Sequence, residues 1–290
     1  MNNKITKIKF KSALGVTGHL FGRVACLGAV ILACSSALAQ NLFVSGGDAG
    51  GGKIFKFTWD GVQSIFASGL STPQGLVFDT GGNLFVADGG NIYKFNPLGV
   101  RSTFTSGLSS PLGLAFDSAG NLFVTDSGNI YKFNPLGLRS TFASGTSGFG
   151  LAFDNAGNLF VSDGGDIVGF SGHIYKFTPD GVRTLFASGL IAPEGLAFDS
   201  LGNLFVVDGG DIDGLGAAIY KFTPAGVRHT FVSAKRFCIG PGLAIDSAGN
   251  LFVPDWCTGN IYKFTPRGRR STFVSGQGLN ESFSFLAFQR

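Results

Sequence analysis

The side chains best suited to chemistry are carboxylates in one part of the chain. Glu194 stands in the segment Pro193-Glu194-Gly195, close to two stretches rich in glycine and aspartate. Those stretches supply the other candidate oxygen donors, Asp163, Asp166, Asp208 and Asp211. Clustered carboxylates beside flexible glycines suit a hard cation such as Ca²⁺, which takes about six to eight oxygen ligands. A divalent-cation site is therefore one hypothesis, and acid-capped glycine turns without an ion are the alternative.

These carboxylates belong to a repeat, which fixes the elements that must position them. The clearest copies contain Gly-Leu-Ala-Phe-Asp (strand a), Leu-Phe-Val-x-Asp (strand b), Ile-Tyr-Lys-Phe (strand c) and Arg-Ser-Thr-Phe (strand d), and the other copies vary these runs slightly. The Asn-Leu-Phe signature recurs at Asn41, Asn83, Asn121, Asn158, Asn203 and Asn250. Four short strands in a unit of about 40 residues are typical of a propeller blade. We expect an all-β, six-bladed β-propeller with four antiparallel strands per blade.

The two ends of the repeat predict how the ring closes. The first blade begins with strand b at residues 42–44, and the last residues, 285–288, match strand a. The C-terminal strand should therefore complete the N-terminal blade, which leaves no open edge in the ring.

Loop lengths distinguish the two faces of the predicted ring. The a–b and c–d turns keep one length, and we call their side the uniform face. The b–c and d–a connections vary, and we call their side the variable face, where binding is expected. The residue before the strand-a glycine changes from blade to blade: Gln74, Leu112, Phe149, Glu194, Pro241 and Ser284. Gln74 and Glu194 are candidate ligand contacts there, and Glu194 is the only ionisable member.

Residues that recur in most copies are interpreted as scaffold. An aspartate ends strand b in five blades, at Asp88, Asp126, Asp163, Asp208 and Asp255. Such a side chain is expected to accept hydrogen bonds from backbone amides in the loop that follows. The lysine of strand c and the arginine that opens strand d recur in the same way. Trp256 breaks the pattern, since small residues follow the aspartate elsewhere; it either stacks a ligand or plugs a loop.

Residues 1–39 are interpreted as a secretory signal peptide, followed by the propeller at 40–290. Basic residues precede an apolar run at 24–34, and Ala37-Leu38-Ala39 provides a small-x-small cleavage site. The run is too short to span a bilayer, which needs about 20 residues. A lipoprotein signal cut before Cys34 is the less favoured alternative. We therefore expect an exported protein, periplasmic or extracellular, with no transmembrane segment after cleavage near Ala39.

Removing this segment changes the charge of the chain. Residues 1–39 contain five of the 22 basic residues and no acidic residue, which leaves 17 basic and 18 acidic residues in the remainder. A near-neutral chain gives no support for nucleic acid as a partner. Two cysteines remain, Cys238 and Cys257, and an even number in an exported chain favours a disulfide. We expect a monomer.

The run Gly-Leu-Ala-Phe-Asp-x-x-Gly-Asn-Leu-Phe-Val-x-Asp resembles NHL-repeat proteins and the related gluconolactonase and streptogramin-lyase propellers. In gluconolactonase-like enzymes a similar Glu-Gly element binds a divalent metal, which the resemblance assigns to Glu194. Those enzymes also use an Asn before a similar Gly, and no strand a of this chain has one. Streptogramin-lyase chemistry depends on inward histidines, whereas His173 and His229 fall in strands c and d.

Three functions are consistent with these observations. The favoured hypothesis is an exported NHL-type binding or interaction module that holds a small molecule, a glycan or a protein on its variable face. The alternative is a gluconolactonase-like, metal-dependent lactone or ester hydrolase centred on Glu194. A purely structural role in an envelope or surface assembly is the third. No Ser/His/Asp arrangement, phosphate-binding glycine loop or zinc-ligand spacing supports other chemistry.

Overall fold

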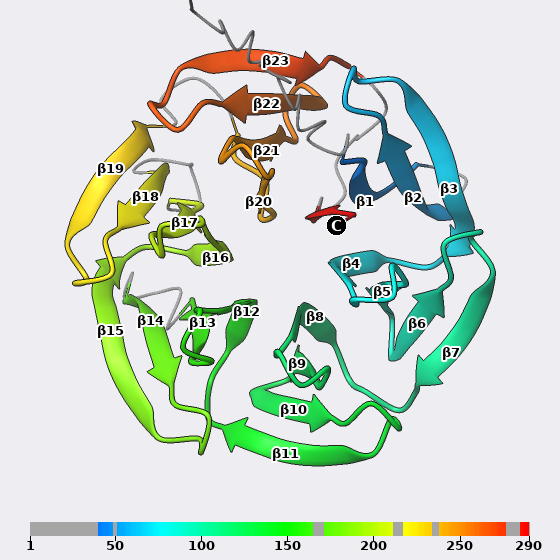
Figure 1. Ribbon diagram of the computed structural model, residues 1–290, viewed down its shortest axis with the longest axis horizontal. Helices are drawn as coiled ribbons and strands as arrows, with labels where there is room; N and C mark the ends of the chain where they lie inside the picture. The colour runs from blue at the N-terminus through cyan, green and yellow to red at the C-terminus, as the bar shows by residue number, and fades with distance from the viewer. Residues whose placement is uncertain are drawn as a thin grey trace, which may run out of the picture. The chain divides into compact units, whose positions relative to one another are not determined.

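The computed structural model describes residues 40–48, 51–164, 171–210, 217–233, 238–276 and 285–289. The chain divides into two units, Met1–Ser36 and Ala37–Arg290, and the described residues all lie in the second. The predicted signal segment, including Cys34 and Ala39, is outside them. The second unit is a ring of six four-stranded antiparallel sheets (Figure 1), which confirms the predicted six-bladed β-propeller. The described residues include no helix that is long and apolar enough to span a bilayer.

Every blade has its strands in the order a, b, c, d, with strand a at the centre of the ring (Figure 1). Blade 1 contains β24 (Leu286–Phe288), β1 (Leu42–Asp48), β2 (Gly51–Phe57) and β3 (Gln63–Leu70). Blade 2 contains β4 (Pro73–Phe78), β5 (Leu84–Asp88), β6 (Asn91–Phe95) and β7 (Arg101–Thr105). Blade 3 contains β8 (Pro111–Phe116), β9 (Leu122–Asp126), β10 (Asn129–Phe133) and β11 (Arg139–Ser144).

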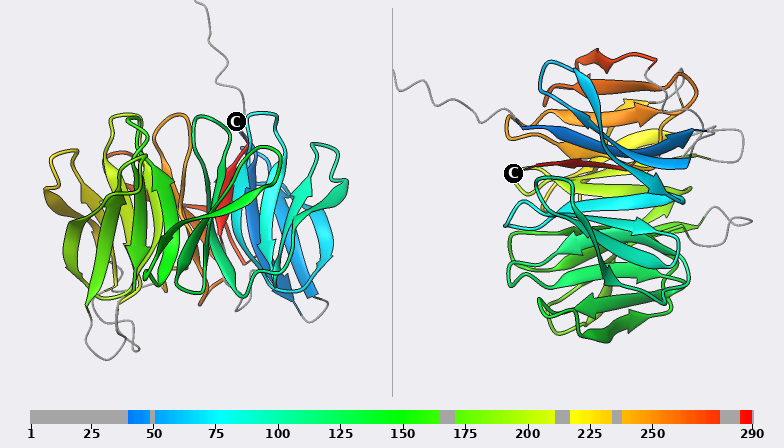
Figure 2. Two further views of the ribbon diagram at one scale, coloured as in Figure 1. Left: turned by 90° about the horizontal axis from the view of Figure 1, so that it is seen from below. Right: turned by 90° about the vertical axis from the view of Figure 1, so that its right-hand side faces the viewer.

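The other three blades follow the same order. Blade 4 contains β12 (Gly148–Phe153), β13 (Leu159–Asp163), β14 (Gly172–Phe177) and β15 (Arg183–Leu190). Blade 5 contains β16 (Pro193–Phe198), β17 (Leu204–Asp208), β18 (Ala218–Phe222) and β19 (Arg228–Ser233). Blade 6 contains β20 (Ala244–Ile245), β21 (Leu251–Asp255), β22 (Asn260–Phe264) and β23 (Arg270–Val274). Antiparallel order places the a–b and c–d turns on one face and the b–c and d–a connections on the other (Figure 2).

Phenylalanine accounts for much of the packing between blades. Phe85 of β5 meets Phe104 of its own blade and Phe116 of the next blade edge to face, with ring centroids 5.1 and 5.0 Å apart. This geometry is favoured by the aromatic quadrupole. Equivalent triads are centred on Phe43, Phe123, Phe160 and Phe252. The repeated phenylalanines therefore join neighbouring blades rather than filling isolated sheets.

The recurrent basic residues have scaffold positions. Lys94 lies 3.8 Å from Asp79 of the a–b turn and 5.3 Å from the centroid of the Phe85 ring. Arg101 lies over Tyr93, with its guanidinium carbon 4.9 Å from the ring centroid. The same contacts recur around the ring, as the sequence predicted.

The C-terminal strand closes the ring. β24 pairs with β1 in the register Leu42↔Phe288, Phe43↔Ala287 and Val44↔Leu286, which confirms the predicted closure. The Phe285 amide also donates to the Ser45 hydroxyl at 2.9 Å. Phe288 meets Phe252 of blade 6 edge to face at 5.0 Å. The first and last blades are therefore joined by side-chain packing as well as by backbone hydrogen bonds.

Candidate functional site

The central channel of the ring is narrow, and its wall exposes backbone polar groups as well as apolar side chains. It is lined by the Gly-Leu pairs of strand a, with Phe285 and Leu286 completing the wall. Its volume is about 70 Å³, far below the about 300–1,000 Å³ of a small-molecule pocket. No ionisable side chain is among these lining residues. A ligand the size of a sugar or a lactone does not fit inside the channel.

The strand-a glycines are required because neighbouring backbones approach closely at the channel. A Cβ on Gly150 would lie 2.3 Å from the Glu194 carbonyl oxygen, and one on Gly195 would lie 2.3 Å from the Pro241 carbonyl oxygen. Each glycine also lies within a bulge. In blade 5, Pro193 pairs with Asp208 and Leu196 with Val206. Glu194 and Gly195 therefore share one opposing residue, and a bulge of this kind redirects side chains.

Glu194 sits beside the channel at the start of strand a, on the variable face. Its carboxylate lies against Gly209, with Cδ and both oxygens 3.6 Å from where a Cβ of Gly209 would be. Its own carbonyl oxygen accepts a hydrogen bond from the Ser162 hydroxyl of blade 4 at 2.5 Å. Burial raises the pKa of the Glu194 carboxyl to about 7, and the nearby charge of Asp208 adds to this effect. Among the described residues this carboxylate has no hydrogen-bond donor.

Asp208 is committed to the scaffold. It is 1% exposed and accepts amide hydrogen bonds from Ile191 and Ala192 at 2.7–3.1 Å. Asp88 and Asp126 make the same pair of contacts in their blades. These contacts confirm that the aspartate accepts backbone amides, but the amides belong to the d–a connection before strand a and not, as the sequence predicted, to the loop that follows strand b. The carboxylate therefore links the d–a connection to the end of strand b.

The structure describes only three of the five residues that the sequence suggested as oxygen donors for a cation. Asp163 is buried at the end of β13, while Asp166 and Asp211 fall outside the described residues. In the described part of the chain, no group of three acidic, histidine or cysteine side chains close enough to share an ion includes Glu194. Asp208 is engaged by backbone amides, and a divalent-metal site that includes Asp166 and Asp211 stays a prediction.

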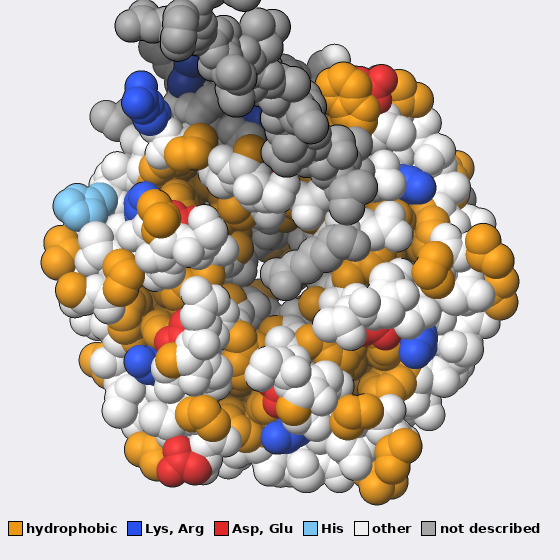
Figure 3. Space-filling view, in the orientation of Figure 1, with side chains coloured by type: hydrophobic (Ala, Val, Ile, Leu, Met, Phe, Trp, Pro, Cys, Tyr) orange, Lys and Arg blue, Asp and Glu red, His pale blue; other side chains and the backbone are white. Residues whose placement is uncertain are grey.

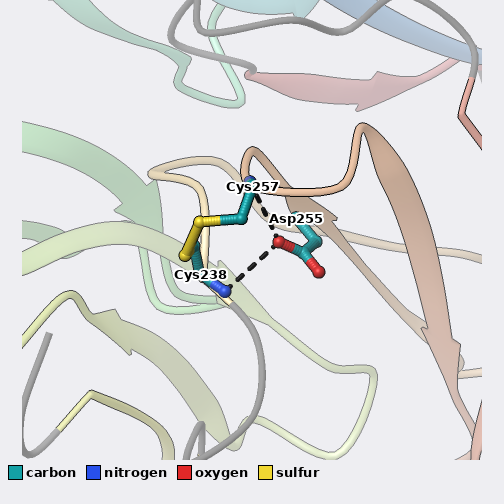
Figure 4. A group of neighbouring side chains, drawn as sticks. All are labelled: Cys238, Asp255 and Cys257. Atoms are coloured by element: carbon teal, nitrogen blue, oxygen red, sulfur yellow. Dashed lines mark hydrogen bonds between the residues drawn. A yellow bond between two sulfur atoms is a disulfide. The ribbon is translucent and has the colours of Figure 1, made fainter.

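The group that does bring three such side chains together is a disulfide beside a capping carboxylate (Figure 4). Cys238 and Cys257 are bonded, with Cα atoms 5.5 Å apart, as predicted. Asp255 accepts the amide hydrogens of both cysteines at 3.2 and 3.1 Å, and the Thr258 hydroxyl at 2.8 Å. The disulfide therefore reinforces the link that the carboxylate alone makes in blades 2, 3 and 5.

Replacing both cysteines by serine should lower the free energy of unfolding by about 3 kcal/mol, because the bridge closes a loop of 19 residues in the unfolded chain. Urea unfolding of protein produced under oxidising conditions measures the loss. A reducing agent should destabilise the native protein by a similar amount and leave the double variant unchanged. Equal stability of both proteins would contradict a structural role for the bridge.

Trp256 stands between the capping aspartate and the disulfide. Its backbone amide donates to the Cys238 carbonyl at 3.2 Å, and the residue is 39% exposed. The backbone that carries the indole is therefore held in place on both sides. The residue keeps this exposure on the variable face, and the stacking of a ligand by Trp256 stays a prediction.

The rim residues that precede the strand-a glycines are mixed in character. Gln74, Leu112, Phe149 and Glu194 are half-buried. A Cβ on Gly164 would touch the Phe149 ring at 3.5 Å, so Phe149 occupies in blade 4 the place that Glu194 occupies in blade 5. The sequence identified this row of positions, but the contribution of its apolar members to the surface became visible only in the fold.

The sequence analysis did not single out Thr146. It takes the place of Leu70, Leu108 and Leu190 in the d–a connections, and its amide bonds to the Gly128 carbonyl as that of Leu108 does to Gly90. Thr146 is 2% exposed, and its hydroxyl makes no hydrogen bond among the described residues. The signal was available in the repeat, as a polar residue at a leucine position.

Substituting Thr146 by valine should raise the free energy of unfolding by about 1 kcal/mol, because it removes a buried hydroxyl without a partner and keeps the shape of the side chain. Denaturant unfolding measures the gain. Thr146→Ser, which keeps the hydroxyl and loses the methyl group, is the matched control and should destabilise. A valine variant less stable than the native protein would show that the hydroxyl has a partner.

The histidines are in the outer strands, as expected. His173 lies in β14 and stacks on Tyr175, with ring centroids 5.8 Å apart and an interplanar angle of 16°. His229 lies in β19 and is exposed. Neither one is among the residues that line the channel.

The fold is shared with propellers of several functions. A chain from the crystal structure of a nidogen/laminin complex superposes with a TM-score of 0.73 at 22% identity, covering 87% of this chain and 98% of that one. A gluconolactonase from Xanthomonas campestris gives a TM-score of 0.64 at 16% identity, covering 83% and 86%.

A virginiamycin B lyase from Staphylococcus aureus, a catalytically inactive variant with quinupristin, gives a TM-score of 0.59 at 14% identity, covering 82% and 86%. No protein-family model matches the chain, and no curated protein matches it either. At these identities the likeness establishes the six-bladed propeller fold, and function must be argued from the site.

Proposed function

We propose that this protein is an exported binding module that holds its ligand on the variable face of the propeller. The channel geometry carries the proposal. With about 70 Å³ and a wall of glycine, leucine and phenylalanine, the channel offers neither the space nor the polar side chains of an active-site pocket. The ligand therefore contacts the outer surface of the variable face, where the connections differ from blade to blade.

The described residues of that face support binding better than catalysis. The rim combines the amide of Gln74, the aromatic ring of Phe149 and the carboxylate of Glu194, with Trp256 on the b–c connection of blade 6. Large aromatic side chains on a rigid scaffold are frequent anchors in binding surfaces. Glycans and proteins are the ligand classes of suitable size, because both can cover an open surface.

The proposal is tested with labelled protein on a glycan array and a peptide array. Binding is expected, and Trp256→Ala should abolish it, because an anchor residue contributes about 2 kcal/mol or more. Leu201→Ser, in an a–b turn on the opposite face, is the control and should bind like the native protein. Binding that is lost with Leu201→Ser and kept with Trp256→Ala would reject the variable face as the site.

A gluconolactonase-like hydrolase centred on Glu194 is the second candidate, favoured by one observation: the pKa of this carboxyl is raised to about 7, as enzymes often arrange for acid–base groups. Hydrolysis of glucono-δ-lactone, followed with Ca²⁺, Mn²⁺ or Zn²⁺ present, decides between the two. Metal-dependent turnover that disappears in Glu194→Gln would establish the hydrolase and reject the pure binding module. No turnover in the native protein is the result we expect.

A further inference from the structure

Apolar side chains are concentrated at the tips of the c–d turns in three consecutive blades. Leu98 and Leu136 are 88% and 85% exposed, and Val100 and Leu138 beside them are 63% and 67% exposed. Trp59, in the turn of blade 1, is 70% exposed. We call these five residues the apolar arc. Figure 3 shows hydrophobic side chains along the outer rim where β3, β7 and β11 begin in Figure 1.

The other four blades place different residues at the tip position of Leu98 and Leu136. This position is occupied by Asp60 in blade 1, where Trp59 precedes it, by Asp180 in blade 4, by Ala225 in blade 5 and by Arg267 in blade 6. Since all six turns have one length, the scaffold does not require leucine there. The leucine tips therefore distinguish blades 2 and 3, whereas an exposed valine occupies the position of Val100 and Leu138 in blades 1, 4 and 5 as well.

The backbone amide groups of the two leucine turns make their hydrogen bonds within the turn. In the turn 96–100, the Asn96 side-chain oxygen accepts the amide hydrogens of Leu98 at 3.0 Å and of Val100 at 2.9 Å. The amides of Asn96 and Gly99 bond within the turn, to Val100 and Asn96 respectively, and Pro97 has no N–H. Every amide hydrogen of this turn is thus satisfied without water.

The turn 134–138 of blade 3 has the same set of bonds, with Asn134 in place of Asn96. The four remaining turns begin with threonine, whose hydroxyl accepts only the last amide, from Val62, Val182, Val227 or Arg269. The two turns with leucine at the tip are therefore also the two turns in which every backbone amide hydrogen is hydrogen-bonded within the turn. A backbone N–H group without a hydrogen-bond partner is costly in the hydrocarbon of a bilayer. The two leucine turns avoid this cost if they enter lipid.

The charge next to the leucine tips is basic. Exposed Arg101 and Arg139 follow the two turns directly and lie over Tyr93 and Tyr131. Lys94 and Lys132 lie near the turn aspartates Asp79 and Asp117, at 3.8 and 4.0 Å. The aspartates offset the charge of the two lysines, so the two arginines leave a net positive charge at the base of the tips. If the leucines entered a bilayer, the headgroup phosphates would lie at this level.

The area of the arc argues against a protein partner of its own. The four aliphatic side chains of blades 2 and 3 and Trp59 together bury roughly 600 Å² at most, which is below the about 800 Å² per partner in a stable protein complex. A lipid surface needs no such area, since a few inserted apolar side chains with flanking basic residues suffice for peripheral binding. We propose that the apolar arc docks this protein on an anionic lipid surface, with Leu98 and Leu136 as the inserted residues.

The test is cosedimentation of the exported protein with phosphatidylcholine vesicles that contain phosphatidylglycerol, after its mass has shown that no N-terminal leader remains. Binding is expected, and it should weaken as salt is raised. Each inserted leucine contributes roughly tenfold in affinity, so Leu98→Ser/Leu136→Ser should bind about a hundredfold more weakly. Leu201→Ser is the matched control, because Leu201 is 78% exposed in a turn of blade 5 outside the arc; it should bind normally.

Three results would overturn the proposal. The native protein could fail to bind these vesicles, or the double variant could bind as well as the native protein. Sedimentation velocity could also show a dimer that the double variant lacks, in which case a second copy covers the arc. Because the substituted residues are exposed, the melting temperature of the double variant should match that of the native protein, which separates loss of docking from loss of fold.

Discussion

Deleting residues 283–290 should leave a protein that is largely unfolded at physiological temperature. The deletion removes β24, and with it the ring contact of Phe288 to Phe252 and the buried Leu286 side chain, which is 7% exposed. Truncation of a buried leucine costs about 2–5 kcal/mol and of a phenylalanine about 3–5 kcal/mol. The combined loss, on the order of 5–10 kcal/mol, is comparable with the whole stability of a typical domain, about 5–15 kcal/mol.

Thermal unfolding by circular dichroism provides the measurement. A chain that lacks Arg290 alone keeps the whole strand and should melt like the native protein, which makes it the matched control. Leu286→Ala should fall between the two, with a loss of about 2–5 kcal/mol. If the truncated chain melts at the native temperature, closure by β24 does not hold the ring together.

Replacing Glu194 by glutamine should stabilise the protein at pH 8 and leave its stability at pH 4 nearly unchanged. The pKa of Glu194 is about 7 in the folded protein, whereas a glutamate in an unfolded chain has a pKa of about 4.3. Between these values the folded protein retains a proton that the unfolded chain has lost. Native stability therefore falls as pH rises through this window, and the loss is complete above pH 7.

The full difference corresponds to on the order of 3 kcal/mol. Glutamine cannot ionise, so the variant should lack this slope. Urea unfolding at several pH values measures it, and Asp180→Asn, at an exposed turn, is the control that should follow the native profile. Parallel profiles for the native protein and the Glu194 variant would show that Glu194 is not held in a buried, unpaired state.

The Glu194 measurement also bears on the second candidate function. A divalent cation would favour the ionised carboxylate and should reduce the pH slope of the native protein. Repeating the titration with Ca²⁺ separates the two cases, because a carboxylate without co-ligands gives the same slope with and without the ion. An unchanged slope is expected from the ligands that the described residues provide.

The sequence by itself determined the architecture. The repeat of four short strands predicted six blades, and the missing strand a at the N-terminus predicted closure by residues 285–288. It also predicted the Cys238–Cys257 bridge and that the recurrent aspartates accept backbone amides, although not which connection supplies them. These features follow from local chemistry, in which turn residues, alternating burial and the repeat period act within one or two blades, so that periodicity reveals them.

Only the tertiary structure decided what the candidate site contains. The sequence placed Glu194 at a rim position, but its raised pKa depends on burial and on Asp208, which the strand order brings close. The volume of the channel depends on how closely the backbones of neighbouring blades approach at Gly150 and Gly195. The exposure of Leu98 and Leu136 depends on the path of the c–d turns. All of these depend on distances between blades, and a repeat period carries no information about them.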